Sequence, residues 1–114
     1  LYLAVRSHVV SLLREGFDFD LIDAHYFYPD GVAAVMLGRA LGKPVVITGR
    51  GTDLNLIPQY RLPARQIGWA ASHAAGMITV AGALVAALAA CGGSLAASIA
   101  CGTGCSAWHR SGSC

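Results

Sequence analysis

The chain has 114 residues, which is enough for one small domain with a single hydrophobic core. Its formal net charge is only +2, and its Lys and Arg residues do not form the dense cluster of a nucleic-acid-binding surface. We therefore expect one core rather than two, and the charge pattern excludes nucleic acid as a partner.

The first part of the chain predicts two helices with a strand between them. Residues 1–15 place apolar side chains at helical spacing, and Gly16 can end this helix. Residues 21–25 are apolar at their centre, as expected of a parallel strand that is covered on both faces. A second helix is predicted over residues 31–41, with Asp30 placed to cap its first turn.

The middle of the chain continues the alternation of strands and helices. Residues 44–48 are rich in β-branched side chains and lead into a glycine-rich loop at residues 49–53. A helix over residues 64–74 follows, and residues 77–80 predict a third strand. Parallel strands need helical crossovers, so this order predicts an α/β fold with a Rossmann-like, doubly wound parallel sheet.

Candidate site residues follow the predicted strands. Ligands of open parallel sheets bind beyond the carboxyl ends of the strands, which here are followed by residues 25–30, 49–53 and 81–82. In the second loop, the Arg50 guanidinium can bind a phosphate or sugar hydroxyls in a forked manner. Asp53 in the same loop can accept hydrogen bonds from hydroxyls. These groups fit a sugar or phosphate ligand.

Structural roles for the same residues remain open. His25 can be an ordinary structural histidine at a strand end, Asp30 a helix cap, and Asp53 the cap of the turn that follows it. The sequence offers no pair of nucleophile and base and no metal-ligating cluster.

The C-terminal part has a different composition. All six acidic residues lie in the first half, and Arg110 is the only charged residue after Arg65. Residues 74–91 form an uncharged run that is long enough for a membrane-spanning helix, although we favour a buried strand followed by a helix. The four cysteines lie in this part, and we interpret them as accidental rather than as a disulfide cluster or a zinc site with His109.

Two segments resemble the N-terminal domain of group 1 (family four) glycosyltransferases. They are residues 19–34, FDLIDAHYFYPDGVAA, and residues 42–55, GKPVVITGRGTDLN. Residues 70–88 are similar to the next segment of that family, so the resemblance covers most of the chain up to residue 90. It implies a partial N-terminal domain of a GT-B glycosyltransferase. In such enzymes this domain holds the acceptor, while a C-terminal domain binds the nucleotide-sugar donor.

The resemblance also implies a reaction. A sugar is transferred from a nucleoside diphosphate sugar to a hydroxyl of a carbohydrate or lipid acceptor, with retention of configuration and without a metal or other cofactor. Arg50 stands where the family often has a histidine, so no catalytic residue carries over. The substrate-binding residues that the resemblance implies are Arg50, Gly51, Thr52 and Asp53 in one loop and His25, Tyr26 and Asp30 in the other.

We expect residues 1–92 to be the partial acceptor-side domain and residues 93–114 to be a Gly/Ala/Ser/Cys-rich tail that is translated out of frame. Without a donor-binding domain, this chain alone is expected to be inactive. The alternatives are a standalone, non-enzymatic α/β domain that binds a ligand or partner, and a small membrane protein. No signal peptide precedes the first helix, so the expected compartment is the cytoplasm or the inner face of the membrane.

Overall fold

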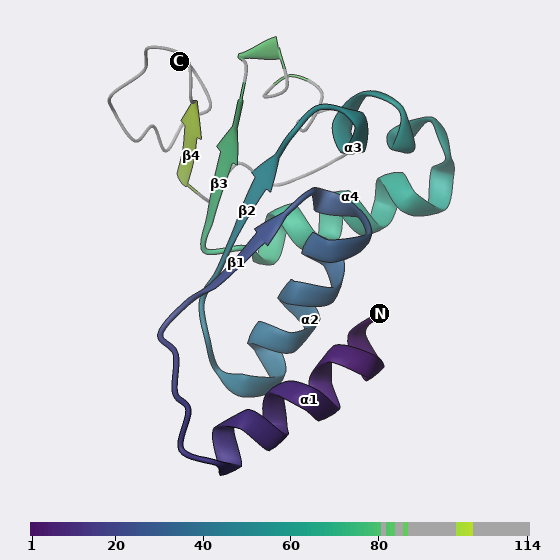
Figure 1. The fold of residues 1–114 in the computed structure, drawn as a ribbon. Helices are drawn as coiled ribbons and strands as arrows, with labels where there is room; N and C mark the ends of the chain where they lie inside the picture. The colour runs from purple at the N-terminus through teal and green to yellow at the C-terminus, as the bar shows by residue number, and fades with distance from the viewer. Residues whose placement is uncertain (81, 84–85, 87–97, 102–114) are drawn as a thin grey trace.

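The computed structural model describes residues 1–80, 82–83, 86 and 98–101, and a parallel sheet organises this part of the chain (Figure 1). The strands are β1 (Ile22–His25), β2 (Val45–Gly49), β3 (Gly76–Thr79) and β4 (Ser98–Cys101), in that order across the sheet. His25 lies opposite Thr48, and Gly49 lies opposite Thr79. The predicted Rossmann-like α/β fold is confirmed. Because the strands are parallel, their carboxyl ends all lie at the same end of the sheet.

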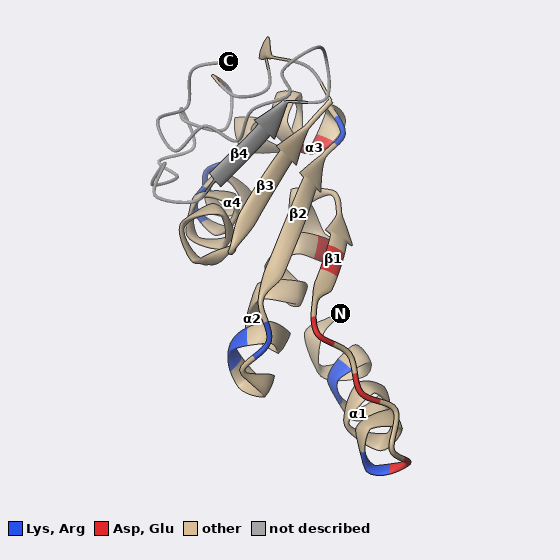
Figure 2. Cartoon of the chain, turned by 90° about the vertical axis from the view of Figure 1, so that its left-hand side faces the viewer, with Lys and Arg blue, Asp and Glu red and all other residues tan. Residues whose placement is uncertain are grey.

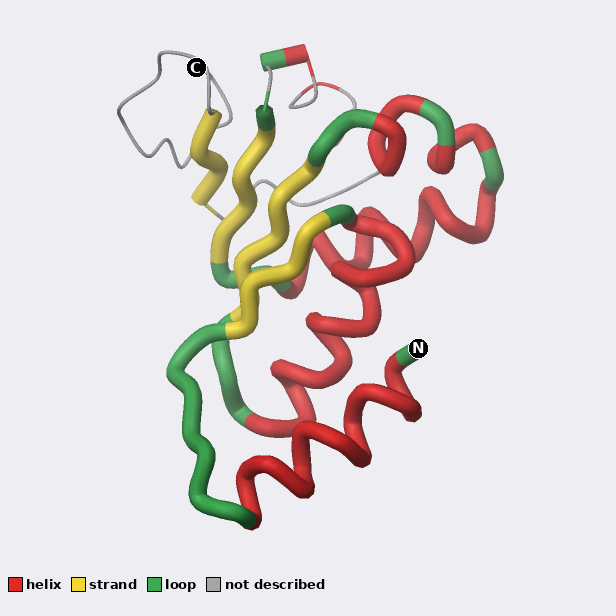
Figure 3. The backbone as a smooth tube through the Cα atoms, in the orientation of Figure 1, coloured by secondary structure: helices red, strands yellow, loops and turns green. Residues whose placement is uncertain are grey.

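Helices connect the first three strands and cover one face of the sheet (Figures 1 and 3). α2 (Val32–Leu41) follows β1, α4 (Arg61–His73) follows β2, and the two helices contact each other. α1 (Tyr2–Arg14) contacts α2 and has no buried residue. α4 begins three residues before its predicted start because Pro63 falls in the first turn, where the helix needs no N–H from that residue.

The core lies between the sheet and these helices. Alternate residues of β2 are buried, and Ile47 is fully buried among side chains of α2 and α4. Val35 of α2 and Ile67 of α4 are equally inaccessible. Phe27, the second residue after the end of β1, is also fully buried. The loop after β1 is therefore anchored to the core at its first turn.

Asp30 does not cap α2, contrary to the sequence-based prediction. Residues Phe27–Gly31 form a π-helical turn that runs directly into α2, and Gly31 at the N-cap has no side-chain cap. The Gly31 N–H instead donates to the carbonyl of Tyr26 at 2.9 Å. Because the chain is already helical at Gly31, the first turn of α2 does not present its N–H groups to Asp30, whose side chain is exposed.

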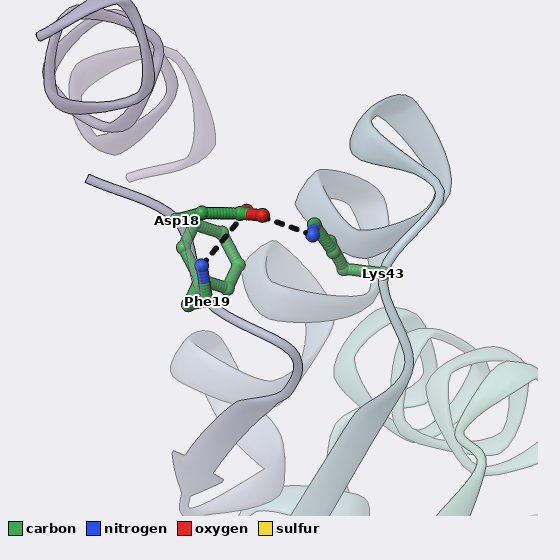
Figure 4. A network of polar contacts seen from close by, with 3 residues as sticks. All are labelled: Asp18, Phe19 and Lys43. Carbon is green, nitrogen blue, oxygen red and sulfur yellow. Dashed lines mark hydrogen bonds and ion pairs between the residues drawn. The ribbon is translucent and has the colours of Figure 1, made fainter. Parts of the chain in front are cut away.

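The opposite edge of the sheet has a polar link of its own (Figure 4). Lys43, just before β2, donates from Nζ to Asp18 Oδ1 at 2.9 Å, and the same oxygen accepts the N–H of Phe19 at 2.9 Å. The Lys43 ammonium also lies 5.4 Å from the centroid of the Phe19 ring. The hydrogen bond from Lys43, and secondarily that from Phe19, lowers the pKa of Asp18. This link joins the segments that enter β1 and β2.

Only part of the chain after residue 74 lies within the described residues. β3 occupies residues 76–79, so the strand interpretation of the uncharged run is confirmed there and a single helix over residues 74–91 is not formed. In the described ranges, no helix has the length and apolar character needed to cross a bilayer. β4 was not predicted and falls inside the proposed tail. Residues 93–97 and 102–114, which carry most of the out-of-frame prediction, lie outside the described residues.

Candidate functional site

The candidate site lies at the carboxyl ends of β1 and β2 (Figure 1). These strands are parallel neighbours, so the segment that begins at Tyr26 and the loop that begins at Arg50 leave the sheet at the same edge. In the third predicted loop, Ala81 lies outside the described residues, whereas Gly82 is described and has open space around it. The structure therefore brings together the residues predicted after the first two strands.

Arg50 and His25 meet across this edge. Arg50 Nη1 lies 3.2 Å from His25 Nδ1, and both side chains are exposed. Arginine can only donate, so Nδ1 must accept and the neutral imidazole carries its proton on Nε2. Nε2 lies 3.6 Å from Asp23 Oδ2. The remaining guanidinium N–H groups are available at the surface, where they can bind an oxyanion or vicinal hydroxyls.

Asp53 has a different environment from the one expected of a ligand-binding carboxylate. Its side chain is 0% exposed. Oδ2 accepts the N–H of Phe27 at 2.7 Å, and Oδ1 accepts the N–H groups of Arg50 at 3.1 Å and Gly51 at 3.0 Å. Three charge-assisted hydrogen bonds compensate for burial of the carboxylate. Asp53 thus joins the loop after β1 to the loop after β2, and it lies beneath the Arg50 loop.

The backbone of both loops adopts uncommon conformations. Tyr26 has φ of 78°, a value that non-glycine residues rarely adopt, and Gly51 has φ of 132°. The Tyr26 N–H donates to the Thr48 carbonyl at 2.9 Å and its own carbonyl accepts from Gly31, so hydrogen bonds hold the residue on both sides. A Cβ at Gly49 would lie 2.7 Å from Leu54 Cδ1, so the buried Leu54 side chain would have to shift to admit one. These loops are closely fitted to the core.

A cavity adjoins the strand end. It has a volume of about 300 Å³ and lies between α1, β1 and α2. Its lining includes the polar side chains of Asp23, His25 and Asp30, and the rest of its wall is mainly apolar, including Val5 of α1 and Leu1 just before that helix. Two residues of the predicted site, His25 and Asp30, therefore share one hollow.

Two other residues of the predicted site, Thr52 and Tyr26, are exposed. Thr52 is exposed and begins the short helix α3 (Thr52–Asn55), and Tyr26 is 42% exposed. Asp23 was not among the predicted site residues. Its spacing of two from His25 within a strand could have identified it, because alternate residues of a strand point to the same face. Among the described residues, no group of three His, Cys, Asp or Glu side chains is arranged to hold a metal ion.

The fold and the strand-end site define a Rossmann-like α/β domain of the kind that binds ligands beyond the carboxyl ends of its strands. Residues 1–100 match the profile of the family described as Glycosyltransferase Family 4, and the chain belongs to that family. The match confirms the resemblance seen in the sequence and extends it into β4. No curated protein matches the chain.

Proposed function

We propose that this chain is the acceptor-side part of a glycosyltransferase that moves a sugar from a nucleoside diphosphate sugar to a hydroxyl acceptor. Membership of Glycosyltransferase Family 4 supports the class of transferase. In the proposed reaction the bond between the anomeric carbon and the diphosphate breaks, a bond to the acceptor oxygen forms, and the hydroxyl proton is released. The configuration of the sugar is retained, and no metal or other cofactor takes part.

One observation supports this proposal most directly. Arg50 presents a guanidinium at the carboxyl end of β2, and the backbone that carries it is fixed by Asp53. Fixed hydrogen-bond donors bind sugar hydroxyls or a diphosphate with little loss of conformational freedom. We assign Arg50, Thr52, His25, Tyr26 and the nearby Asp30 to substrate contact.

Asp53 and Gly51 have a positioning role in the proposal. The Asp53 carboxylate already accepts three backbone N–H groups, so it acts on the substrate through the loop geometry that it maintains. Gly51 supplies the positive φ that starts the turn into α3.

The donor side of the reaction is assigned to a second domain. Groups that stabilise the leaving diphosphate would come from that domain, so the isolated chain is expected to bind an acceptor without transferring sugar. The proposed location is the cytoplasm, at the inner face of the membrane where the acceptor is a lipid.

The test is an Arg50→Ala substitution in the full-length enzyme, with steady-state kinetics of sugar transfer. We expect kcat/KM to fall by about ten- to hundredfold, because a hydrogen bond to a charged group contributes about 1.5 to 3 kcal/mol. Arg14→Ala on the distant helix α1 is the matched control. Unchanged kcat/KM in a folded Arg50→Ala enzyme would exclude the loop from the site. If the full-length enzyme uses no nucleoside diphosphate sugar, glycosyl transfer itself is wrong and a non-enzymatic binding domain is favoured.

A further inference from the structure

The outer surface of α2 and α4 combines apolar and basic side chains. This surface, which we term the α2–α4 face, consists of Met36, Arg39, Arg61, Leu62, Arg65 and Trp69. A groove of about 480 Å³ runs along it, lined by Met36 of α2 and by Leu62, Arg65 and Trp69 of α4. The face lies opposite the side of α4 that packs into the core, which is formed by Ile67, Ala70 and Ala71.

Two apolar residues of the face, Leu62 and Met36, are not part of the core, whereas Trp69 is partly buried and packs against it. Leu62 is 66% exposed and Met36 is 39% exposed, and the apolar surface continues at Tyr60, which is 70% exposed just before α4. Leu56, one turn earlier in the chain, is also largely exposed. A large apolar side chain that stays in water gains nothing for folding, so a cluster of them indicates a contact with another apolar phase.

The charge of the face has a single sign. α2 and α4 together contain Arg39, Arg61 and Arg65 and no acidic residue. Figure 2 shows basic segments on α2 and α4 and no acidic segment on either helix; the acidic segments lie on β1, on the chain that leads into it, beside the C-terminal end of α1 and at α3. Within the described part of the chain, the carboxylates that contact a basic group are Asp23, beside His25, and Asp18, beside Lys43, so the three arginines have no acidic partner there. The Arg39 guanidinium lies 5.9 Å from the centroid of the Trp69 ring, which keeps this cation beside the apolar groove.

We propose that the α2–α4 face docks onto the surface of an anionic lipid bilayer. Leu62 and Met36 would enter the boundary between headgroups and acyl chains beside the partly exposed Trp69, while the flanking arginines reach lipid phosphates through their long side chains. The uniform positive charge complements an anionic membrane surface, whereas a typical protein–protein interface has few charges at its centre. Docking of this kind is peripheral, and it does not depend on the sugar-transfer activity proposed above.

Co-sedimentation of the 114-residue chain with lipid vesicles tests this proposal. Vesicles of mixed phosphatidylcholine and phosphatidylglycerol should bind the chain, vesicles of phosphatidylcholine alone should bind it weakly, and added salt should reduce binding. The test variant is the pair Arg61→Glu and Arg65→Glu, and the control is the pair Arg6→Glu and Arg14→Glu on α1. Both change net charge equally at exposed positions. We expect the test variant to lose at least about twentyfold in partitioning, and the control no more than about twofold, since only charges close to the bilayer contribute strongly.

A second variant, Leu62→Ser, removes an exposed apolar group and should weaken binding without changing charge. The proposal is overturned if neutral vesicles bind as well as anionic ones, or if the α1 control loses as much binding as the α4 variant. It is also overturned if light scattering without vesicles shows that the chain self-associates and that Leu62→Ser abolishes the association, because the occupant is then a second copy. None of these measurements uses a sugar, so they can fail while the proposed transfer reaction stands.

Discussion

Asp53 joins the two loops that follow the carboxyl ends of β1 and β2. Asp18 joins the two segments that precede the amino ends of the same strands. Asp53 is fully buried and accepts three backbone N–H groups. Asp18 is largely exposed and binds a flexible lysine. Both connect the same pair of strands, but only the first is shielded from water and salt. Burial, rather than residue type, therefore decides which of the two links fixes the geometry of a site.

The largest expected effect is that of Asp53→Ala. Removal of the carboxylate leaves the N–H groups of Phe27, Arg50 and Gly51 without an acceptor. The first of these hydrogen bonds is buried and the other two are part-buried, and an unsatisfied buried group costs about 1 to 3 kcal/mol. We expect the free energy of unfolding to fall by about 3 kcal/mol or more, measured by urea denaturation.

Asp53→Asn provides the matched control for that loss. The amide keeps one acceptor oxygen, but its NH₂ group would face a backbone donor, so we expect about half the loss of the alanine variant. A loss below about 1 kcal/mol for Asp53→Ala would show that water replaces the carboxylate and that the two links are equivalent.

Gly49 and Gly42 allow the stability of the chain at the carboxyl ends and at the amino ends of the strands to be compared. Gly49→Ala at the carboxyl edge would place a Cβ 2.7 Å from Leu54 Cδ1 and 3.2 Å from Phe27 Cε2, and such overpacking costs about 1 to 3 kcal/mol. Gly42→Ala near the amino edge has open space, so its cost is the left-handed φ of 66° alone, about 1 kcal/mol. Thermal unfolding of the two variants checks the order, and a larger loss for Gly42→Ala would contradict it.

The smallest effect is expected for Asp18→Asn. The pKa of Asp18 is lowered in the folded chain by the hydrogen bonds from Lys43 and Phe19, so the ionised form is favoured by folding. The stabilisation is therefore present above the ordinary aspartate pKa of 3.8 and is lost as the pH falls through the lowered folded value. Denaturation midpoints of both proteins across acidic pH should converge, and high salt should remove the difference at neutral pH. A difference that persists in high salt would contradict the assignment to an exposed link.

The sequence predicts the first three strands because each is a short apolar run with breaking residues on both sides. β4 was missed because Ser98–Cys101 lies in an Ala/Gly/Ser/Cys-rich region without a run of β-branched residues, so only pairing with β3 identifies it. Asp30 was assigned to the cap of α2 because residue types alone cannot reveal the π-helical turn that extends the helix toward β1.

The sequence predicts the candidate site as two strand-end loops, and it does not predict how the side chains are arranged within them. In a parallel sheet the loops after neighbouring strands lie side by side, so the sequence predicts Arg50 and His25 in the same site. The structure places their side chains in contact. The burial of Asp53 depends on the N–H of Phe27, which is 26 residues away in the chain. The residues around Asp53 in the sequence do not indicate a partner so far away. The sequence alone therefore cannot distinguish a carboxylate that faces a ligand from one that supports the loop.

The bend at Tyr26 has a consequence for how relatives of this chain can diverge. The carbonyl of Tyr26 lies 2.9 Å from the place that a Cβ of residue 31 would occupy, and the amide of residue 31 holds that same carbonyl. A side chain at position 31 would force the carbonyl away and release the positive φ at position 26. Positions 26 and 31 are therefore expected to covary in evolution. Relatives that keep the bend should keep glycine at position 31, and relatives that lose this glycine should also have a different loop after β1.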